Sequence, residues 1–504
     1  MEQGRTKILC DIVPTGNEQE DRKIIPRIIE LTKDIHSKNV NDMKKLINYY
    51  FNQTAILGKQ KIQQKTINNK ITINYPEIAV TTINAYCFSN PLTFSARTSG
   101  IEEQVKKFND ALDDDNYSAK SHDMYLNSGI TSLGYRYIIP ANEEEIKNGI
   151  YFKTVCDLSP LNTYCVYSND LRKDKICAIT YHKKKLYDEN LKQSGENTFY
   201  TVFTKYHKWE LYQANGKWKF LKSKINLNGK ITEIEGYPLT YKIIPIVENV
   251  RKTDRTGDFE QAVALIDAIN ALASTRLDAV QQSVDYLLCL RDIDIWSDGA
   301  LSRVQEAIAQ GILGFKSIDG AIVQPSVEVL DIKLNQSEVQ TLQDFLCEKL
   351  EEVLNIPNRE TRSSGGDTGS AVESRNGFRS LENIAGLVTS NAMKTENETL
   401  EVILAMCKNI SSCPFKDLKP KDIEIKDNRN RVENLSTATT AYATLKGAGM
   451  NDADAIVASR LFPDAQAVAS RNKSYAEENK ANENKVAETK VENETQPNNG
   501  TTSK

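Results

Sequence analysis

The architecture of this chain is set by its residues 257–288, GDFEQAVALIDAINALASTRLDAVQQSVDYLL. After Gly257 the stretch holds no glycine or proline, which predicts one long helix that begins at Asp258, with Gln261 completing a capping box. One face of this helix is apolar. Its members recur at helical spacing: Ile266, Ile269, Ala273, Leu277, Val280, Val284 and Leu287.

A second stripe on the same predicted helix is polar and partly acidic. It contains Asp267, Asn270, Ser274, Asp278, Gln281 and Asp285. Their spacings of three and four residues put them on one side of the helix. We interpret this stripe as a solvated helix face, and the alternative is a surface with a specific role.

A second long helix is predicted further along the chain. Asn335 and Glu338 cap its start, and Ile356-Pro357 ends it. Its apolar positions are Val339, Leu342, Leu346, Leu350 and Val353. Residues 289–335, between the two helices, are predicted to form a compact insert with a turn at 297–299, a short helix at 302–310 and strands at 320–323 and 327–330.

On the N-terminal side, residues 1–40 are mixed and polar and form an arm or a first helix. Residues 41–58 predict a helix that ends at Gly58, and residues 75–86 predict another. From about 129 to 247, short β-branched and aromatic runs predict an antiparallel sheet. Its hairpin turns are expected at Asn215-Gly216 and Asn228-Gly229.

Lysine and tyrosine side chains alternate in this sheet region. Such a pattern is found both in surfaces that stack on nucleic-acid bases and in ordinary sheets with one solvated face. We favour cross-strand packing with a solvated face.

On the C-terminal side, residues 359–370, RETRSSGGDTGS, form a glycine-dense loop. A third long helix is predicted over 371–409, and two shorter helices over 433–446 and 453–461. Beyond Arg471 the chain is rich in Asn, Glu, Lys and Thr, which predicts a disordered tail. The mixture of long helices and a sheet region predicts the α+β class.

Composition narrows the classes of protein. The 504 residues predict about three structural units. A mean hydropathy of −0.49 and short apolar runs predict no membrane span, and the first residues lack the pattern of a signal peptide. Nine scattered cysteines predict reduced thiols of a cytosolic product. With 64 basic and 68 acidic residues, the chain does not grip nucleic acid through bulk positive charge, although loose DNA contact is compatible with this balance.

Motifs for catalysis are weak. The sequence Gly369-Ser370-Ala371 lacks the Gly-Lys-[Ser/Thr] ending of a phosphate-binding loop, and Gly314-Phe315-Lys316-Ser317 has Phe in place of the second glycine. The four histidines are dispersed, and Cys407 and Cys413 have no matching second pair for a zinc site. We therefore expect a non-enzymatic protein, with no catalytic residues, no metal and no cofactor.

Four stretches in a fixed order carry a family resemblance. They are Tyr49-Tyr50 with Ile83-Asn-Ala-Tyr86 and Asn90-Pro91; Ile244-Pro-Ile-Val247 leading into Gly257–Glu260 and Leu265–Asn270; Leu354-Asn-Ile-Pro357; and Gly365–Gly369 with Ala371, Val372, Arg375, Gly377 and Phe378. Together they resemble the portal proteins of tailed bacteriophages, in the branch common in siphophages of Gram-positive hosts. Some members carry an aromatic residue before the two glycines, where this chain has Ser364.

The resemblance implies a portal fold and a division of the chain into its parts. These are an arm (1–40), a wing (41–257), a first stem helix (258–288), a clip (289–335), a second stem helix (336–357), a tunnel loop (359–370), a long wing helix (371–413), a crown (414–470) and a tail (471–504). It also implies a ring, usually of twelve copies, at one capsid vertex of the virion, assembled in the cytoplasm of the host bacterium.

Such a ring would serve as the channel through which double-stranded DNA enters and leaves without sequence-specific contacts. Its implied partners are the terminase large subunit, head–tail connector proteins, and the major capsid and scaffolding proteins. The implied tunnel-loop residues are Arg359, Arg362, Ser364, Gly365, Gly366, Asp367, Thr368 and Gly369. We further hypothesise that Asp267, Asp278 and Asp285 face the channel and keep DNA from sticking.

Two other classes of function stay open at this point. One is a phosphate-binding enzyme that uses the glycine loop at 363–370. The other is a scaffold or adaptor outside the portal family, built on the long helices.

Overall fold

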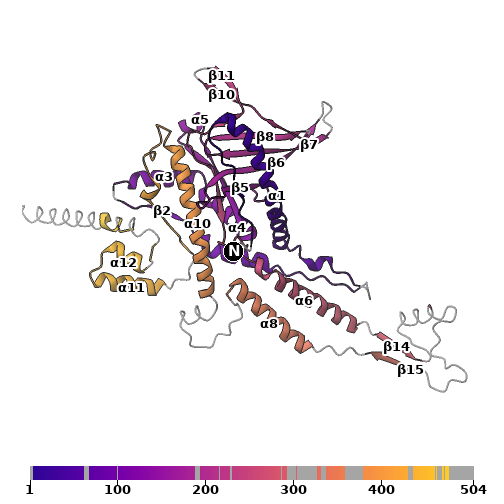
Figure 1. Cartoon of the computed structure of the whole chain (residues 1–504). Helices are drawn as coiled ribbons and strands as arrows, with labels where there is room; N and C mark the ends of the chain where they lie inside the picture. Colours follow the sequence, from indigo (N-terminus) through magenta and orange to yellow (C-terminus); the bar gives the residue numbers. More distant parts are fainter. Residues whose placement is uncertain are drawn as a thin grey trace, which may run out of the picture. The chain divides into compact units, whose positions relative to one another are not determined.

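The computed structural model describes residues 4–61, 67–98, 100–187, 193–214, 216–227, 230–284, 287–291, 302, 326–330, 336–357, 378–429, 435–459, 461–462, 468–469 and 471–475. The chain forms two compact units. The larger comprises Met1–Ile47, Glu77–Glu260 and Asn355–Lys504, and the smaller comprises Asn48–Pro76 and Gln261–Leu354. Helices and sheets are mixed throughout (Figure 1), so the predicted α+β class is confirmed.

The main sheet of the larger unit has the strand order β1-β5-β6-β7-β8-β12, with β9 paired to β8. The bounds are β1 Leu9–Cys10, β5 Thr163–Ser168, β6 Lys175–Tyr187, β7 Gln193–Thr204, β8 His207–Ala214, β9 Lys217–Phe220 and β12 Gly236–Pro238. All pairs are antiparallel except β1 with β5. The N-terminal segment is held by main-chain bonds as well, because the Gly4 amide donates to the Asp254 carbonyl and that of Arg5 to the Arg255 carbonyl.

One long helix, α1 (Glu18–Tyr50), covers a face of this sheet. Ile25, Ile28 and Ile29 are fully buried and share a core with Trp209 of β8. Of the two alternatives for residues 1–40, the first helix is confirmed from Glu18 onward, but the predicted start of a separate helix at 41 and its end at Gly58 are wrong. The helix ends at Tyr50, and Ala55–Gly58 is a separate 3-10 turn, η1.

The predicted hairpins and several predicted helices are confirmed. Ala214 pairs with Lys217, and Leu227 of β10 (Ser223–Leu227) pairs with Lys230 of β11 (Lys230–Ile234). Both pairings leave two-residue connections, as expected for Asn-Gly turns. The helices that match their predictions are α2 (Tyr75–Phe88), α11 (Leu435–Gly447) and α12 (Asp452–Ser459).

A second, three-stranded sheet in the larger unit has the order β13-β3-β4, formed by Ile246–Val250, Leu133–Pro140 and Phe152–Val155. Helices α4 (Tyr117–Thr131) and α10 (Phe378–Cys407) pack against it. Around it lie α3 (Glu102–Asp114), α5 (Glu143–Lys147), the turn η3 (Pro420–Asp422) and the pair of β2 (Thr93–Ala96) with β16 (Ile423–Lys426). Eight cysteines in the described residues are free thiols, seven of them buried.

The smaller unit contains two long helices, α6 (Val263–Val284) and α8 (Gln336–Leu354), which contact each other. Strands β14 (Leu287–Arg291) and β15 (Ser326–Leu330) form an antiparallel pair. The remaining features predicted for 289–335 lie outside the described residues.

The start of α6 differs from its prediction. A 3-10 turn, η2 (Glu260–Ala262), precedes α6, which begins at Val263. Asp258 does not cap it, because the Arg251 guanidinium binds both of its carboxylate oxygens, at 2.7 and 3.1 Å. A nearby buried cation therefore outcompetes the helix terminus for this carboxylate.

Candidate functional site

The polar stripe of α6 is the part of the predicted site that the structure describes. Asp267 and Asp278 lie on it. Asp285 and the whole tunnel loop, with Arg359, Arg362, Ser364, Gly365, Gly366, Asp367, Thr368 and Gly369, lie outside the described residues, as do Arg375 and Gly377.

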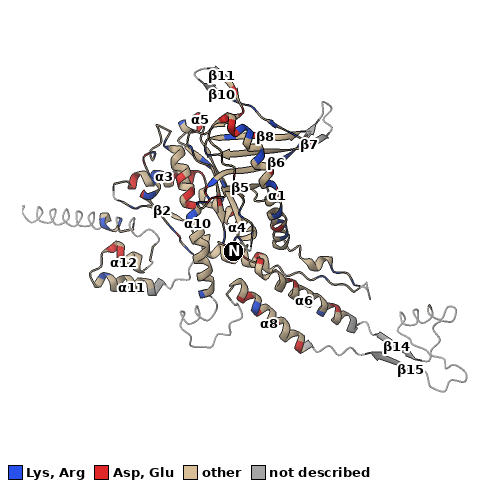
Figure 2. Cartoon of the chain, in the orientation of Figure 1, with Lys and Arg blue, Asp and Glu red and all other residues tan. Residues whose placement is uncertain are grey.

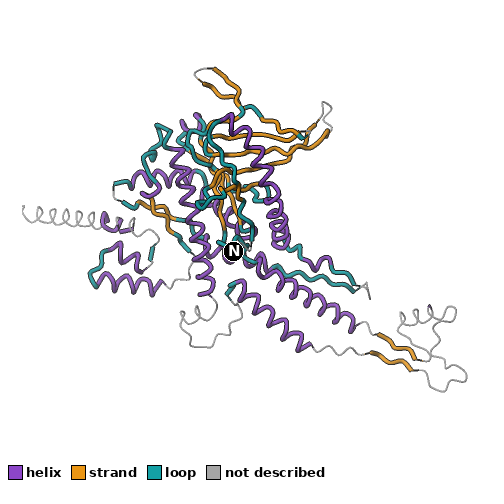
Figure 3. The backbone as a smooth tube through the Cα atoms, viewed as in Figure 1, coloured by secondary structure: helices purple, strands orange, loops and turns teal. Residues whose placement is uncertain are grey.

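A segment of the chain between α1 and α2 runs along this stripe within the smaller unit (Figure 3). We call residues 67–74 the cover segment. Its main-chain amides at alternate residues donate to α6 side chains that are four residues apart. Asn69 donates to Asp278 Oδ1 at 2.7 Å, Ile71 to Ser274 Oγ at 2.9 Å, and Ile73 to Asn270 Oδ1 at 3.0 Å.

The spacing of the donor amides along the cover segment matches the spacing of the acceptor side chains along α6. Four residues of an α-helix rise about 6.0 Å, and two residues of an extended chain advance about 6.6 Å. The helix and the cover segment run antiparallel, so each amide meets the next acceptor along the stripe without bending either partner. Small polar residues at positions 270, 274 and 278 therefore hold an extended chain much as a neighbouring strand would.

Asp278 is the most heavily bonded residue of the stripe. Besides the Asn69 amide, its carboxylate accepts the Asn69 side-chain amide at 2.8 Å and the ammonium groups of Lys59 and Lys61, each at 2.9 Å. The side chain is 2% exposed. Burial alone would raise the pKa of Asp278, but the bonds from Lys59, Asn69 and Lys61 outweigh it and hold the pKa below its usual value.

Asp267 binds at the other end of the stripe. Both of its carboxylate oxygens accept the Tyr49 hydroxyl, at 2.8 and 3.0 Å. Burial and this hydrogen bond raise the pKa of Tyr49 to about 12. Tyr49 is one of the residues that carried the family resemblance, and the structure gives it a partner on α6.

The interpretation of the stripe as a solvated face is wrong for its centre. Asn270 and Ser274 are fully buried, and Asp278 nearly so, because the cover segment lies over them. Sequence reasoning missed the covering residues Lys59, Lys61 and Asn69. The repeated four-residue spacing of small polar residues was the available signal, since a merely solvated face does not require small side chains.

The two long helices are joined by polar contacts and leave apolar side chains uncovered. Arg276 of α6 donates to Gln340 and Gln343 of α8, at 2.5 and 3.1 Å. Leu342 and Phe345 on α8 are 49% and 52% exposed. Long apolar side chains left in water on a helix face mark a surface that another chain can cover.

A buried ion pair fixes α10 in the larger unit. Arg136 of β3 donates to both carboxylate oxygens of Glu396 of α10, at 2.9 and 3.0 Å, and both side chains are fully buried. The hydroxyls of Tyr117 and Tyr125 also donate to Glu396. Burial lowers and Glu396 raises the pKa of Arg136, with a net rise. Helix α10 is thus held by a charged cluster whose members are all hydrogen-bonded.

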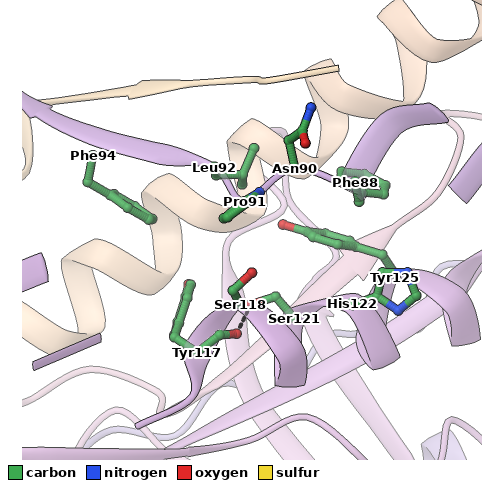
Figure 4. Close-up of a pocket in the computed structure, with 10 residues that line it drawn as sticks. All are labelled: Phe88, Asn90, Pro91, Leu92, Phe94, Tyr117, Ser118, Ser121, His122 and Tyr125. Atoms are coloured by element: carbon green, nitrogen blue, oxygen red, sulfur yellow. Dashed lines mark hydrogen bonds between the residues drawn. The ribbon is translucent and has the colours of Figure 1, made fainter. Parts of the chain in front are cut away.

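A small pocket of about 40 Å³ opens beside this cluster, between residues 88–94 and one face of α4 (Figure 4). The rings of Phe88 and Tyr125 stack at its wall, with centroids 3.9 Å apart. The exposed His122 lies on its rim, with Nε2 3.2 Å from the Asn84 amide nitrogen. The lining is largely apolar, but it also carries the Ser118 and Ser121 hydroxyls and the His122 ring. Ser121 Oγ is already bonded, since it donates to the Tyr117 carbonyl at 2.7 Å and accepts from Arg136 at 2.7 Å.

No cluster of three or more metal-ligating side chains occurs among the described residues. Within the same ranges, no helix has the length and apolar character needed to span a membrane.

A family model described as "Phage portal protein, SPP1 Gp6-like" matches residues 29–485 of the chain. The chain belongs to this phage portal family. The match runs from α1 through both long helices, the glycine-dense stretch at 359–370 and the C-terminal helices. As a portal protein the chain is a structural component of the virion capsid, in a family that works as an oligomeric ring. No curated protein matches the chain.

Proposed function

We propose that this portal protein closes into a ring of twelve copies at one capsid vertex and forms the channel for packaging and ejection of double-stranded DNA. The observation that carries the proposal is the family match across residues 29–485. The uncovered Leu342 and Phe345 on α8 support it, because a ring must bury lateral surfaces of each copy against the next.

The electrostatics of α6 suit a passage for a polyanion. A conduit must not hold phosphates tightly, since each tight contact slows sliding. Lys59 and Lys61 both bind the single carboxylate of Asp278, which offsets one of their two positive charges inside the chain. We place the side of α6 that carries Asp267 and Asp285 toward the channel. Asp278 lies on the same side but is 2% exposed beneath the cover segment, so it does not face DNA itself.

Asp285 provides the cleaner test of that placement. Lysine at 267 or 278 would also break the contacts with Tyr49 or with the cover segment. Asp285→Lys should slow packaging and make its rate more dependent on salt. An unchanged packaging rate with unchanged salt dependence would show that this side of α6 does not face the channel.

The tunnel loop is proposed to project into the channel around moving DNA. Its residues are Arg359, Arg362, Ser364, Gly365, Gly366, Asp367, Thr368 and Gly369, and its glycines permit backbone conformations that other residues reach only with strain. Deleting 363–369 should leave ring formation intact and block DNA filling. Loss of assembly would instead make the segment a structural linker.

The remaining partners follow from the same proposal. The clip (289–335) would dock the terminase large subunit and later the head–tail connector, and the wing would meet the major capsid and scaffolding proteins. We place the protein among siphophages of Gram-positive hosts, with assembly in the host cytoplasm.

Negative-stain electron microscopy of the purified chain tests the ring. Class averages along the particle axis should show closed rings with a hole wide enough for duplex DNA, and they give the subunit count. Helical assemblies without an axial hole would favour the scaffold or adaptor. Nucleotide turnover by the purified chain would favour the phosphate-binding enzyme.

A further inference from the structure

The main sheet of the larger unit lies in the most basic part of the chain. Residues 172–234 contain fourteen lysine and arginine residues against six aspartate and glutamate residues, whereas the whole chain has 64 against 68. Much of this positive charge lies on β6, β8 and β9 and their turns (Figure 2). Because acidic residues slightly outnumber basic ones in the whole chain, this local excess of lysine and arginine indicates a surface suited to a partner of opposite charge.

The strands turn two different rows of side chains to the two faces of the sheet. One row is Tyr181, Tyr200, Leu211 and Phe220, which pack into the core shared with α1. The neighbouring row is offset by one residue on every strand. It consists of His182, Phe199, Tyr212 and Lys219. Because neighbouring residues of a strand point to opposite faces, this second row lies on the face away from α1.

The aromatic members of the second row form a stack. The rings of His182 and Phe199 are 5.8 Å apart and within 17° of parallel, and those of Phe199 and Tyr212 are 5.0 Å apart and within 28°. Beyond Thr180, the last residue of β6 opposite β5, β7 is the one strand paired with β6 within the part of the chain that the structure describes. His182 is therefore the terminal ring of the stack, and it is exposed.

Three lysines flank this stack. Lys184 lies over the Phe199 ring at 5.1 Å, and Lys217 and Lys219 are exposed on β9. Among the described residues none of these three forms an ion pair. By contrast, Lys183 pairs with Glu196 and Lys222 with Glu233. The face that carries the aromatic stack thus presents three lysines that have no ion pair among the described residues.

We propose that this face binds single-stranded nucleic acid, in addition to the passage of duplex DNA through the ring. An unpaired base continues the ring stack on the open side of His182, and Lys184, Lys217 and Lys219 contact the phosphates. A duplex has its base faces closed by its own stacking, so it engages the lysines alone. An acidic peptide satisfies the lysines and leaves the stack unused.

Fluorescence anisotropy with a labelled, covalently closed circle of single-stranded DNA tests the proposal. A closed circle cannot thread through a ring, so binding in an axial channel is kept out of the signal. The purified full chain should bind the circle more tightly than a duplex of equal charge. Equal binding of the two, or no binding of the circle, would overturn the proposal.

Two variants and a matched control locate the site. The triple variant Lys184→Gln, Lys217→Gln, Lys219→Gln should lower the slope of log K against log salt by about 2, since each contact on a single strand contributes about 0.7. His182→Ala should weaken binding about tenfold. The control Lys183→Gln, Lys185→Gln, Lys222→Gln removes the same charge, and an equal loss of slope in the control would contradict the assignment.

Discussion

Replacing Asp278 with alanine should release the cover segment from α6. The carboxylate accepts four hydrogen bonds, one of them from the main-chain amide of Asn69. A buried amide that loses its acceptor costs about 1–3 kcal/mol. Lys59 and Lys61 are 20% and 22% exposed, so water replaces part of their pairing, and we take about 0.5–1 kcal/mol for each. The free energy of local opening should therefore fall by about 3 kcal/mol.

Hydrogen exchange of the amides at 69, 71 and 73 measures this opening. A loss of about 3 kcal/mol corresponds to exchange about a hundredfold faster. Asp278→Asn keeps an acceptor for the Asn69 amide and should lose about half as much. Gln281→Ala is the matched control, since the exposed Gln281 accepts only one bond, from the Asn69 side chain at 2.7 Å.

The effect should also follow pH with a definite sign. The folded pKa of Asp278 is lowered, so its contribution is fully present above the unfolded value of about 3.9 and is lost as pH falls below it. Exchange at 69–73 should therefore be pH-corrected and compared at pH 7 and pH 3. Unchanged protection in Asp278→Ala at pH 7, or an equal loss in Gln281→Ala, would refute this account of the stripe.

Three further perturbations probe the larger unit. Arg136→Met should destabilise it by about 3–5 kcal/mol in thermal unfolding, because Glu396 is left buried and charged. The double variant Arg136→Met, Glu396→Leu should recover much of the stability. A loss below about 1 kcal/mol in the single variant would contradict the role of the pair. Gly4→Ala should detach the N-terminal segment, because an added Cβ would lie 1.8 Å from the Arg255 carbonyl oxygen. The expected result is faster proteolysis before Leu9. Gly58→Ala is the control, because a Cβ added there meets no neighbouring atom. Burial lowers the pKa of His36 to about 4, so stability should decline by about 3 kcal/mol as pH falls from 6.5 to 4; His36→Gln should flatten that decline in denaturant titrations, and an equally steep decline in the variant would assign it to other groups.

Local patterns predicted the parts of the fold that local chemistry controls. The hairpins at Asn215-Gly216 and Asn228-Gly229 and helix α2 are confirmed, because turn residues and periodicity act over a few positions. The predicted starts of α1 and α6 were wrong for a different reason. Asp258 is bound by Arg251 instead of capping α6, and α1 begins at Glu18 because its isoleucines are buried against a sheet that is distant in sequence.

The candidate site also combines a feature that local sequence predicts with one that depends on residues distant in sequence. The stripe of Asn270, Ser274 and Asp278 was visible as a pattern, but its partner was not. The periodicity of a sequence identifies which side of a helix is polar. It does not identify the segment that packs on that side. The partner is an irregular segment whose amides carry no signature of their own, so only the tertiary structure identifies the cover segment.

The matched repeats of α6 and the cover segment also restrict how this family can change in length. One residue inserted between Asn270 and Asp278 turns the following side chains by about 100° and removes them from the row of amides. One residue inserted between Asn69 and Ile73 points the wrong amides at the helix. Insertions between Lys61 and Ile67 leave both repeats intact. Relatives of this protein should therefore gain and lose residues at 62–66 while keeping the lengths of 69–73 and 270–278 constant.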